Sequence, residues 1–198
     1  MQITRTNDGA APSSVDEKNY SNMTTHIPPA TEVLVVADCW SAEPEADAII
    51  HRAIEAASSM VEDDTADAEL AIMLTDDVGI RTLNNNWRGI DKATNVLSFP
   101  ALQPPEGAEV PDDMPMMLGD IAIAYETTRR EADDEEKPFA NHLSHLAVHG
   151  FLHLVGYDHE DNEQAEEMEQ LEREILATLG IPDPYADSDP RANQGEVT

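Results

Sequence analysis

A histidine-rich stretch at residues 142 to 159, HLSHLAVHGFLHLVGYDH, constrains the fold of this chain more than any other feature of its sequence. Three of its histidines, His149, His153 and His159, follow the spacing H-x3-H-x5-H. Residues four apart lie on one face of a helix, so His149 and His153 can both reach one ion. Gly156 can end that helix in a left-handed conformation. The chain can then fold back and bring His159 to the same ion.

Three neutral imidazoles and one water form an open tetrahedral zinc site of the catalytic type. We therefore predict one Zn²⁺ per chain, bound by His149, His153 and His159. His145 lies on the same helical stripe, but it is separated from His153 by about 12 Å along the helix axis. Metal–nitrogen bonds of about 2.0–2.1 Å cannot bridge that gap. We expect His142 and His145 to lie behind the ligands, to face the substrate, or to sit on the surface.

The full spacing, H-G-x-x-H-x-x-G-x-x-H, departs at one position from the long metallopeptidase pattern H-E-x-x-H-x-x-G-x-x-H. Gly150 stands where the peptidase carries its general-base glutamate, and glycine cannot accept a proton. The pattern predicts metal-dependent hydrolysis without that base, because a metal can lower the pKa of its bound water to about 7. Asp158, beside His159, is a candidate to orient a ligand or the water, and it is equally consistent with a turn residue.

The composition is strongly acidic, with a formal net charge of −30 over 198 residues. Such a charge predicts solubility and repulsion of polyanions, and taken alone it argues against nucleic-acid binding. The single cysteine, Cys39, rules out an intramolecular disulfide and fits a reducing compartment. The N-terminal segment MQITRTNDGAAPSSVDEKNYS contains no apolar signal core, and no stretch approaches the length of about 20 apolar residues that spans a bilayer. We expect a cytoplasmic protein with no membrane segment.

The pattern of apolar residues predicts one domain between two tails. Residues 1–30 are expected to be a flexible extension, 31–181 the hydrolase domain, and 182–198 a polar tail. Strands are predicted at 32–37, 68–74, 93–100 and 118–124. Helices are predicted at 44–60, from the cap at Thr75 and Asp76 to an end near Asn84 to Trp87, at 125–135, from Pro138 through the histidines, and from Asp161 or Asn162 to Gly180. This order indicates an α/β (α+β) fold, a small mixed four-stranded sheet packed with about five helices, the histidine-bearing helix being central.

Two acidic features have alternative interpretations. Asp120 interrupts an apolar strand and is expected either to form a local cap or pair, or to support one of the histidines from behind. The last predicted helix carries five glutamates that are most simply a solvated face. They are Glu166, Glu167, Glu169, Glu172 and Glu174.

Four segments together resemble the YbeY family of bacterial zinc-dependent endoribonucleases, which are also described as ribosomal RNA maturation factors. They are HGFLHLVGYDH (149–159), LNNNWRGIDKATNVLSFP (83–100), MMLGDIAIA (116–124) and AEEMEQLEREIL (165–176). The resemblance covers about residues 31–181. It implies a single-domain α/β fold and cleavage of single-stranded RNA. It also implies roles in maturing the 3′ end of 16S ribosomal RNA and in ribosome quality control, with ribosomal RNA and the small ribosomal subunit as partners.

Carried over by residue, the resemblance places the family's metal ligands on His149, His153 and His159, and its arginine near the site on Arg88. A guanidinium at Arg88 can hold a phosphate with two hydrogen bonds and offset charge in the transition state. The alternative is a surface arginine lying over Trp87. Two other functions stay open: a zinc-dependent peptidase or amide hydrolase, which Gly150 disfavours, and a non-catalytic ribosome-assembly factor with structural zinc.

Overall fold

A mixed four-stranded sheet forms the centre of the protein in a computed structural model that describes residues 26–62, 65–102 and 115–186. Its strands are β1 (Ala30–Val35), β2 (Ala68–Thr75), β3 (Val96–Pro100) and β4 (Met116–Ala124), in the order β1-β2-β4-β3. β1 and β4 run parallel to β2, whereas β3 is antiparallel to β4. The predicted sheet is confirmed. Most of the two predicted tails, 1–25 and 187–198, lies outside the described residues.

Five α-helices and one 3-10 helix accompany the sheet. They are α1 (Ala46–Ser58), α2 (Asp77–Arg88), α3 (Tyr125–Asp134), α4 (Phe139–Leu154), α5 (Asn162–Thr178) and the 3-10 helix η1 (Asp38–Ala42). η1 was not expected from the sequence, and it buries Trp40, whose indole N–H donates to the Thr75 carbonyl at 2.8 Å. β3 begins three residues later than predicted, because the Asn95 side chain accepts from the Val96 amide at 2.7 Å and turns the chain into the strand.

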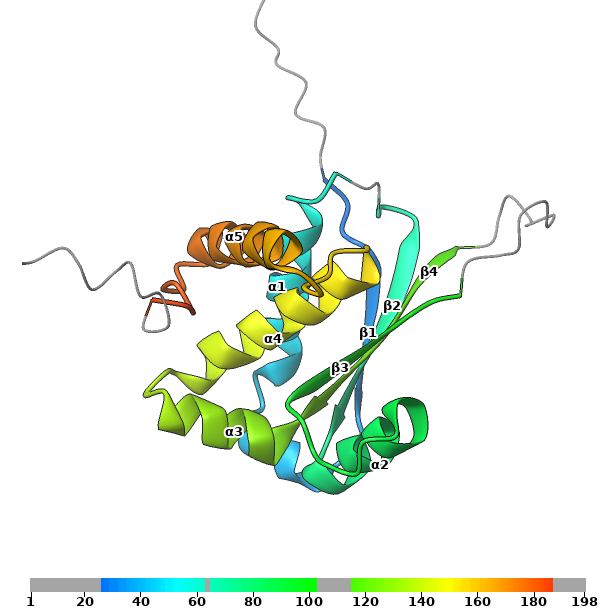
Figure 1. Cartoon of the computed structure of the whole chain (residues 1–198), viewed down its shortest axis with the longest axis vertical. Coiled ribbons are helices and arrows are strands. Elements are labelled where there is room, and N and C mark those ends of the chain that lie inside the picture. Colours follow the sequence, from blue (N-terminus) through cyan, green and yellow to red (C-terminus); the bar gives the residue numbers. More distant parts are fainter. Residues whose placement is uncertain (1–25, 63–64, 103–114, 187–198) are drawn as a thin grey trace, which may run out of the picture.

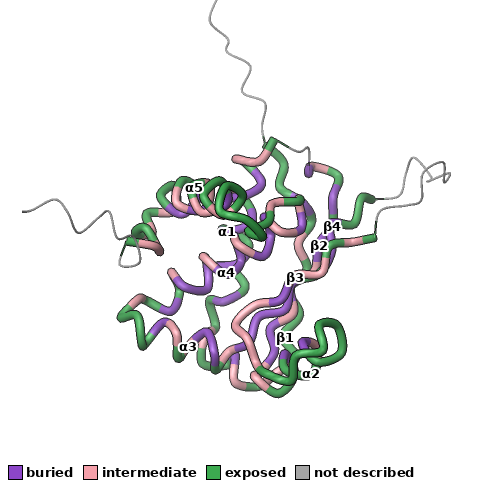
Figure 2. The backbone as a smooth tube through the Cα atoms, viewed as in Figure 1, coloured by how far each residue is buried: buried purple, intermediate pink, exposed green. Residues whose placement is uncertain are grey.

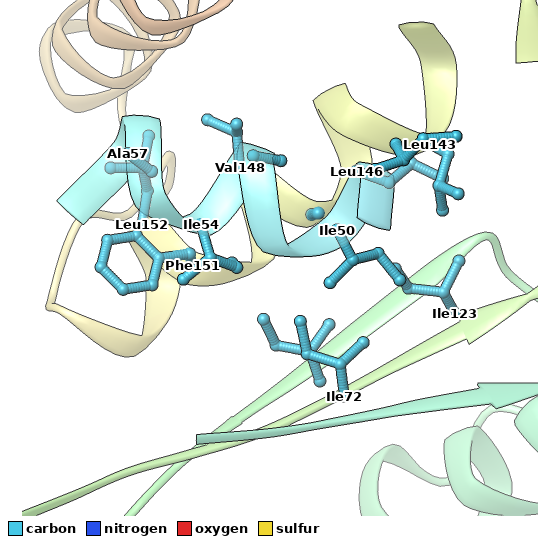
Figure 3. Close-up of a cluster of buried hydrophobic side chains, with 14 of the residues drawn as sticks. Ile50, Ile54, Ala57, Ile72, Ile123, Leu143, Leu146, Val148, Phe151 and Leu152 are labelled. Atoms are coloured by element: carbon cyan, nitrogen blue, oxygen red, sulfur yellow. The ribbon is translucent and has the colours of Figure 1, made fainter. Parts of the chain in front are cut away.

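The helices cover the two faces of the sheet unequally. α1 and α4 pack on one face, with α3 and α5 beside them, whereas α2 lies against the other face (Figure 1). Figure 3 shows the larger core, where side chains of α1 and α4 meet Ile72 and Ile123 of the sheet. The smaller core lies under α2 and comprises Ile80, Leu97, Ala122 and Ala124. α4 is therefore the central helix, as predicted, and Figure 2 shows how much of it is buried.

The predicted helix ends agree with local backbone chemistry. Asp76 caps α2 by accepting from the Gly79 amide at 2.7 Å, and Asp161 caps α5 by accepting from the amides of residues 163 and 164. Gly156 follows α4 with φ of 99°, the left-handed conformation expected for it. Within the described ranges, no helix is long and apolar enough to cross a membrane.

Candidate metal centre

The turn after α4 brings together the three histidines that the spacing singled out. One ring nitrogen from each of His149, His153 and His159 lies within 4.8 Å of the others. The Nε2 atoms of His149 and His153 are 3.2 Å apart. The His159 ring is stacked on that of His149, with centroids 5.5 Å apart. Three imidazole nitrogens at this spacing could hold one metal ion.

Hydrogen bonds on the far side of two rings fix their orientation. Nδ1 of His149 lies 2.8 Å from Glu172 Oε1, and Nδ1 of His153 lies 3.0 Å from the carbonyl oxygen of Tyr157. Both partners are acceptors, so each Nδ1 carries the proton and each Nε2 keeps a free lone pair. This is the tautomer that a metal ligand requires. The donor set therefore fits a metal such as zinc.

Glu172 corrects the expectation that all the glutamates of α5 face solvent. Its side chain is fully buried, and Oε2 contacts His145 Nε2 at 3.1 Å while Oε1 contacts His149. The Tyr185 hydroxyl also donates to Glu172. Burial raises the pKa of Glu172, but the hydrogen bonds from His145 and His149 outweigh it and lower the pKa to about 2. The carboxylate is therefore ionised and paired.

The sequence around Glu172 does carry a signal of its burial. The residue is four positions after Met168 and three before Ile175, both of which are buried on α5. It therefore lies inside the apolar stripe of the helix, where an unpaired carboxylate would be costly. The histidines four and eight positions before His153 on α4 offer the donors that make its burial possible. Tyr185 was also missed, because it falls in the predicted polar tail.

The other two histidines of α4 contact carboxylates and are not part of the group of three. His142 is buried, and its Nε2 lies 3.0 Å from Glu131 Oε2, which also accepts from Nδ2 of the Asn95 side chain at 2.9 Å. His145 reaches Glu172 and thereby lies behind His149. Neither is a free surface residue, so of the three expectations for them the surface location is wrong.

The surroundings of His153 favour its neutral form. Burial lowers the pKa of His153 first, and the neighbouring His149 and His159 lower it further. A neutral imidazole is the form that binds a metal. Asp158 is half-exposed and accepts from the His159 amide at 2.8 Å, while its Oδ1 lies 4.0 Å from His153 Nδ1. It thus acts as a turn residue that positions His159. Its predicted role in orienting water stays a prediction.

A cavity of about 950 Å³ runs along α4 and ends at His149. Its walls carry His142, His145 and Glu131, together with residues 133 to 137 from the end of α3 and the turn that follows. Pro184 and Tyr185 close one side. The turn at 133–136 is entirely acidic, so this wall repels a polyanion unless another partner holds the substrate.

Gly150 lies where α4 comes closest to the sheet. A Cβ atom built on it would lie 3.0 and 3.1 Å from two methyl carbons of Ile121 and 3.3 Å from the Ser98 hydroxyl. The Ser98 hydroxyl donates to the Gly150 carbonyl at 3.2 Å. The position therefore faces the sheet and not the histidines, and a glutamate side chain would not fit there. The sequence prediction that this site lacks the peptidase base agrees with the packing.

Two predicted residues lie on the α2 side of the sheet. Ile121 in β4 faces α4. Successive residues of a strand point to opposite faces, so the preceding residue, Asp120, points away from α4 and is exposed. The prediction that Asp120 supports a histidine is therefore wrong. Arg88 is the last residue of α2, and its exposed side chain makes no hydrogen bond or ion pair within the described residues. The structure does not bring Arg88 into contact with the histidines, and its catalytic role stays a prediction.

Comparison with known proteins identifies the family. The family model described as Endoribonuclease YbeY matches residues 38–180. The chain belongs to the YbeY family. Two similar relatives are named Endoribonuclease YbeY in Rhodopseudomonas palustris, strains BisA53 and BisB18. The first is 75% identical over 171 residues, covering 86% of this chain and 98% of the relative. The second is 77% identical over 167 residues, covering 84% of this chain and 98% of the relative.

A YbeY protein from Nitrobacter hamburgensis is 74% identical over 170 residues, covering 86% of this chain and 89% of the relative. Among solved structures, the solution structure of TM1509 from Thermotoga maritima aligns with a TM-score of 0.48 at 23% identity. That alignment covers 84% of this chain and 99% of the other. The family match confirms the resemblance that the four sequence segments indicated.

Proposed function

We propose that this protein is a zinc-dependent endoribonuclease that cleaves single-stranded RNA at the centre formed by His149, His153 and His159. The observation that supports it most is the pair of Nδ1 hydrogen bonds, which present two Nε2 atoms to a common point. In a chain of the YbeY family, such a centre is best explained as the place where RNA is cut.

Zinc, when bound, would supply a Lewis acid for a phosphodiester oxygen or activate a water molecule. The residues of the chain hold and orient the ligands. Glu172 fixes the ring of His149, the Tyr157 carbonyl fixes that of His153, and Asp158 holds the backbone of His159. We propose in addition that Asp158 orients the attacking group and that Arg88 binds an RNA phosphate through two hydrogen bonds.

We further propose that the substrate is ribosomal RNA, cut during maturation of the 3′ end of 16S ribosomal RNA and in ribosome quality control, in the cytoplasm. The acidic wall of the cavity supports a role for the small ribosomal subunit as a docking partner. RNA affinity normally depends on cationic contacts to phosphates, which this wall does not provide apart from Lys137. A partner that presents the RNA would supply the missing binding energy.

The decisive experiment measures cleavage of a labelled single-stranded RNA and zinc content on the same protein samples. His153→Ala should be folded, depleted of zinc and inactive. His51→Ala is the matched control, because His51 is exposed on α1 and pairs only with Asp47. We expect it to retain both zinc and activity.

Three outcomes would contradict the proposal. Equal cleavage by native protein and His153→Ala would indicate a contaminating nuclease. Peptide cleavage with RNA left intact would favour the peptidase alternative. Unfolding of His153→Ala together with a zinc-loaded but inactive native protein would favour an assembly factor with structural zinc.

A further inference from the structure

The end of α2 exposes an aromatic side chain that the core does not use. Trp87 is 73% exposed, whereas the other tryptophan, Trp40, is 3% exposed. The Trp87 ring leans on that of Phe99 in β3, with centroids 5.7 Å apart and planes at 57°. Ile90, three residues later, is also half-exposed. One side of the indole is thus supported by the sheet, and the rest faces solvent.

Two cations beside Trp87 lack acidic partners. The described residues include eight lysines and arginines, and five of these pair with carboxylates. The other three are Arg52, Arg88 and Lys92, and no ion pair engages them in the described structure. Arg88 and Lys92 flank the turn at Gly89, directly after Trp87. In a chain of net charge −30, two unpaired cations only four residues apart are a distinctive feature.

The one acidic residue between these cations is already engaged. Asp91 accepts two hydrogen bonds from Arg81, at 2.6 and 2.8 Å. Its carboxylate is therefore already paired with Arg81. Asp120, an exposed carboxylate of β4 on the same sheet face, pairs in register with Phe99, so it lies beside the aromatic pair and not in the turn. The turn itself therefore keeps a local excess of positive charge.

We propose that Trp87, Arg88 and Lys92 form a docking surface for single-stranded RNA. This inference rests on the proposed nuclease function and specifies how the substrate is held. An exposed indole offers a face on which bases stack regardless of their identity, and the guanidinium and ammonium groups bind phosphates. A neutral protein partner would not require the two unpaired cations, and charge complementarity therefore favours a polyanion.

The docking surface and the metal centre lie on opposite sides of one edge strand. Phe99 of β3 contacts Trp87 on the α2 side. The preceding residue, Ser98, donates to the Gly150 carbonyl on the α4 side, and Gly150 is next to His149. β3 is the outermost strand of the sheet, so a chain can pass around it (Figure 1). Single-strand binding sites of about 4–16 nucleotides are common, and such a length can connect the two places.

The tryptophan content provides a direct binding assay. Because the chain has only two tryptophans and Trp40 is buried, quenching of the exposed Trp87 reports what binds at the docking surface. The full chain is titrated with a 12-nucleotide oligouridylate in the presence of a chelator, which prevents metal-dependent cleavage. Binding of the variants is measured in parallel by anisotropy of a labelled oligonucleotide.

We expect Trp87→Leu to weaken binding by about 5- to 100-fold, because stacking on the indole is lost. Arg88→Ala and Lys92→Ala should each reduce the slope of log K against log salt by about 0.7, the value for one phosphate contact on a single strand. Arg52→Ala is the matched control, since Arg52 is an unpaired exposed arginine on α1, and it should bind like the native protein.

The proposal is overturned if Trp87→Leu and the double variant R88A/K92A both bind within twofold of the native protein, or if the native protein does not bind the oligonucleotide at all. These results are independent of the nuclease assay. If the native protein binds RNA through Trp87 but does not cleave it, the metal-centre proposal is overturned and the docking surface stands. If the native protein cleaves RNA but its binding does not depend on Trp87, the docking surface is overturned and the metal-centre proposal stands.

Discussion

The carboxylate of Glu172 on α5 lies 2.8 Å from Nδ1 of His149 on α4, although the two residues are 23 positions apart. The same carboxylate contacts His145 and Tyr185. One buried acid thus links α4, α5 and the segment after α5. It also sets which nitrogen of His149 is available to a metal.

Replacing this carboxylate should weaken metal binding. In Glu172→Gln the amide is a poorer acceptor for His149, so we expect zinc affinity to fall by about 10- to 100-fold. The measurement is a competition titration with a zinc chelator. Glu174→Gln is the matched control, because Glu174 is an exposed residue of the same helix whose carboxylate accepts from the Gln170 side chain at 2.7 Å. Equal zinc affinities for both variants would show that the Glu172–His149 contact does not support the metal.

Glu172 should also make stability depend on pH. Its pKa is about 2 in the folded protein and about 4.5 when unfolded, so the unfolded state binds more protons between these values. The stabilisation is present above about pH 4.5 and is lost as the pH falls towards 2. It amounts to about 3 kcal/mol, from about 1.36 kcal/mol for each pKa unit. Urea unfolding of the metal-free native protein and Glu172→Gln should show a difference that shrinks below pH 4.5. A difference that does not change with pH would refute this assignment.

The Tyr185 hydroxyl should contribute measurably to stability. Tyr185→Phe removes the donor to Glu172 but keeps the ring, which lies 4.9 Å from the Arg173 guanidinium and 5.5 Å from the His145 ring. A hydrogen bond to a charged group contributes about 1.5–3 kcal/mol, so the free energy of unfolding at pH 7 should fall by that amount. Tyr125→Phe is the control, since its ring packs against Trp40 and Phe139. If both variants lose the same free energy of unfolding, the hydrogen bond from the Tyr185 hydroxyl to Glu172 does not contribute to stability beyond the loss of any tyrosine hydroxyl.

Gly150 should resist substitution even by alanine. Alanine is favoured over glycine in a helix by about 1 kcal/mol, but its Cβ would press on the buried Ile121. Overpacking typically costs about 1–3 kcal/mol, so we expect Gly150→Ala to lose about 1 kcal/mol net in chemical unfolding. The double variant G150A/I121V removes one of the close methyls and should lose less than the sum of the single changes. A Gly150→Ala protein more stable than the native one would mean that α4 can shift away from the sheet.

Features that depend on neighbouring residues could be predicted from the amino-acid sequence. The four-residue spacing of His149 and His153, the left-handed Gly156 and the caps at Asp76 and Asp161 all follow from helix geometry within one or two turns. The strand pattern likewise indicated the four-stranded sheet, because burial on a strand repeats locally. The group of three histidines could therefore be recognised from its spacing alone.

Packing between distant segments determined which charges are buried and which faces meet. Nothing near Glu172 in the sequence provides the donors that make its burial favourable, because they come from α4 when the two helices pack together. The face of Asp120 depended on the register of β4 against its neighbours, and the position of Arg88 depended on which side of the sheet α2 covers. Burial of a polar group depends on partners distant in the chain, and local patterns carry no information about them.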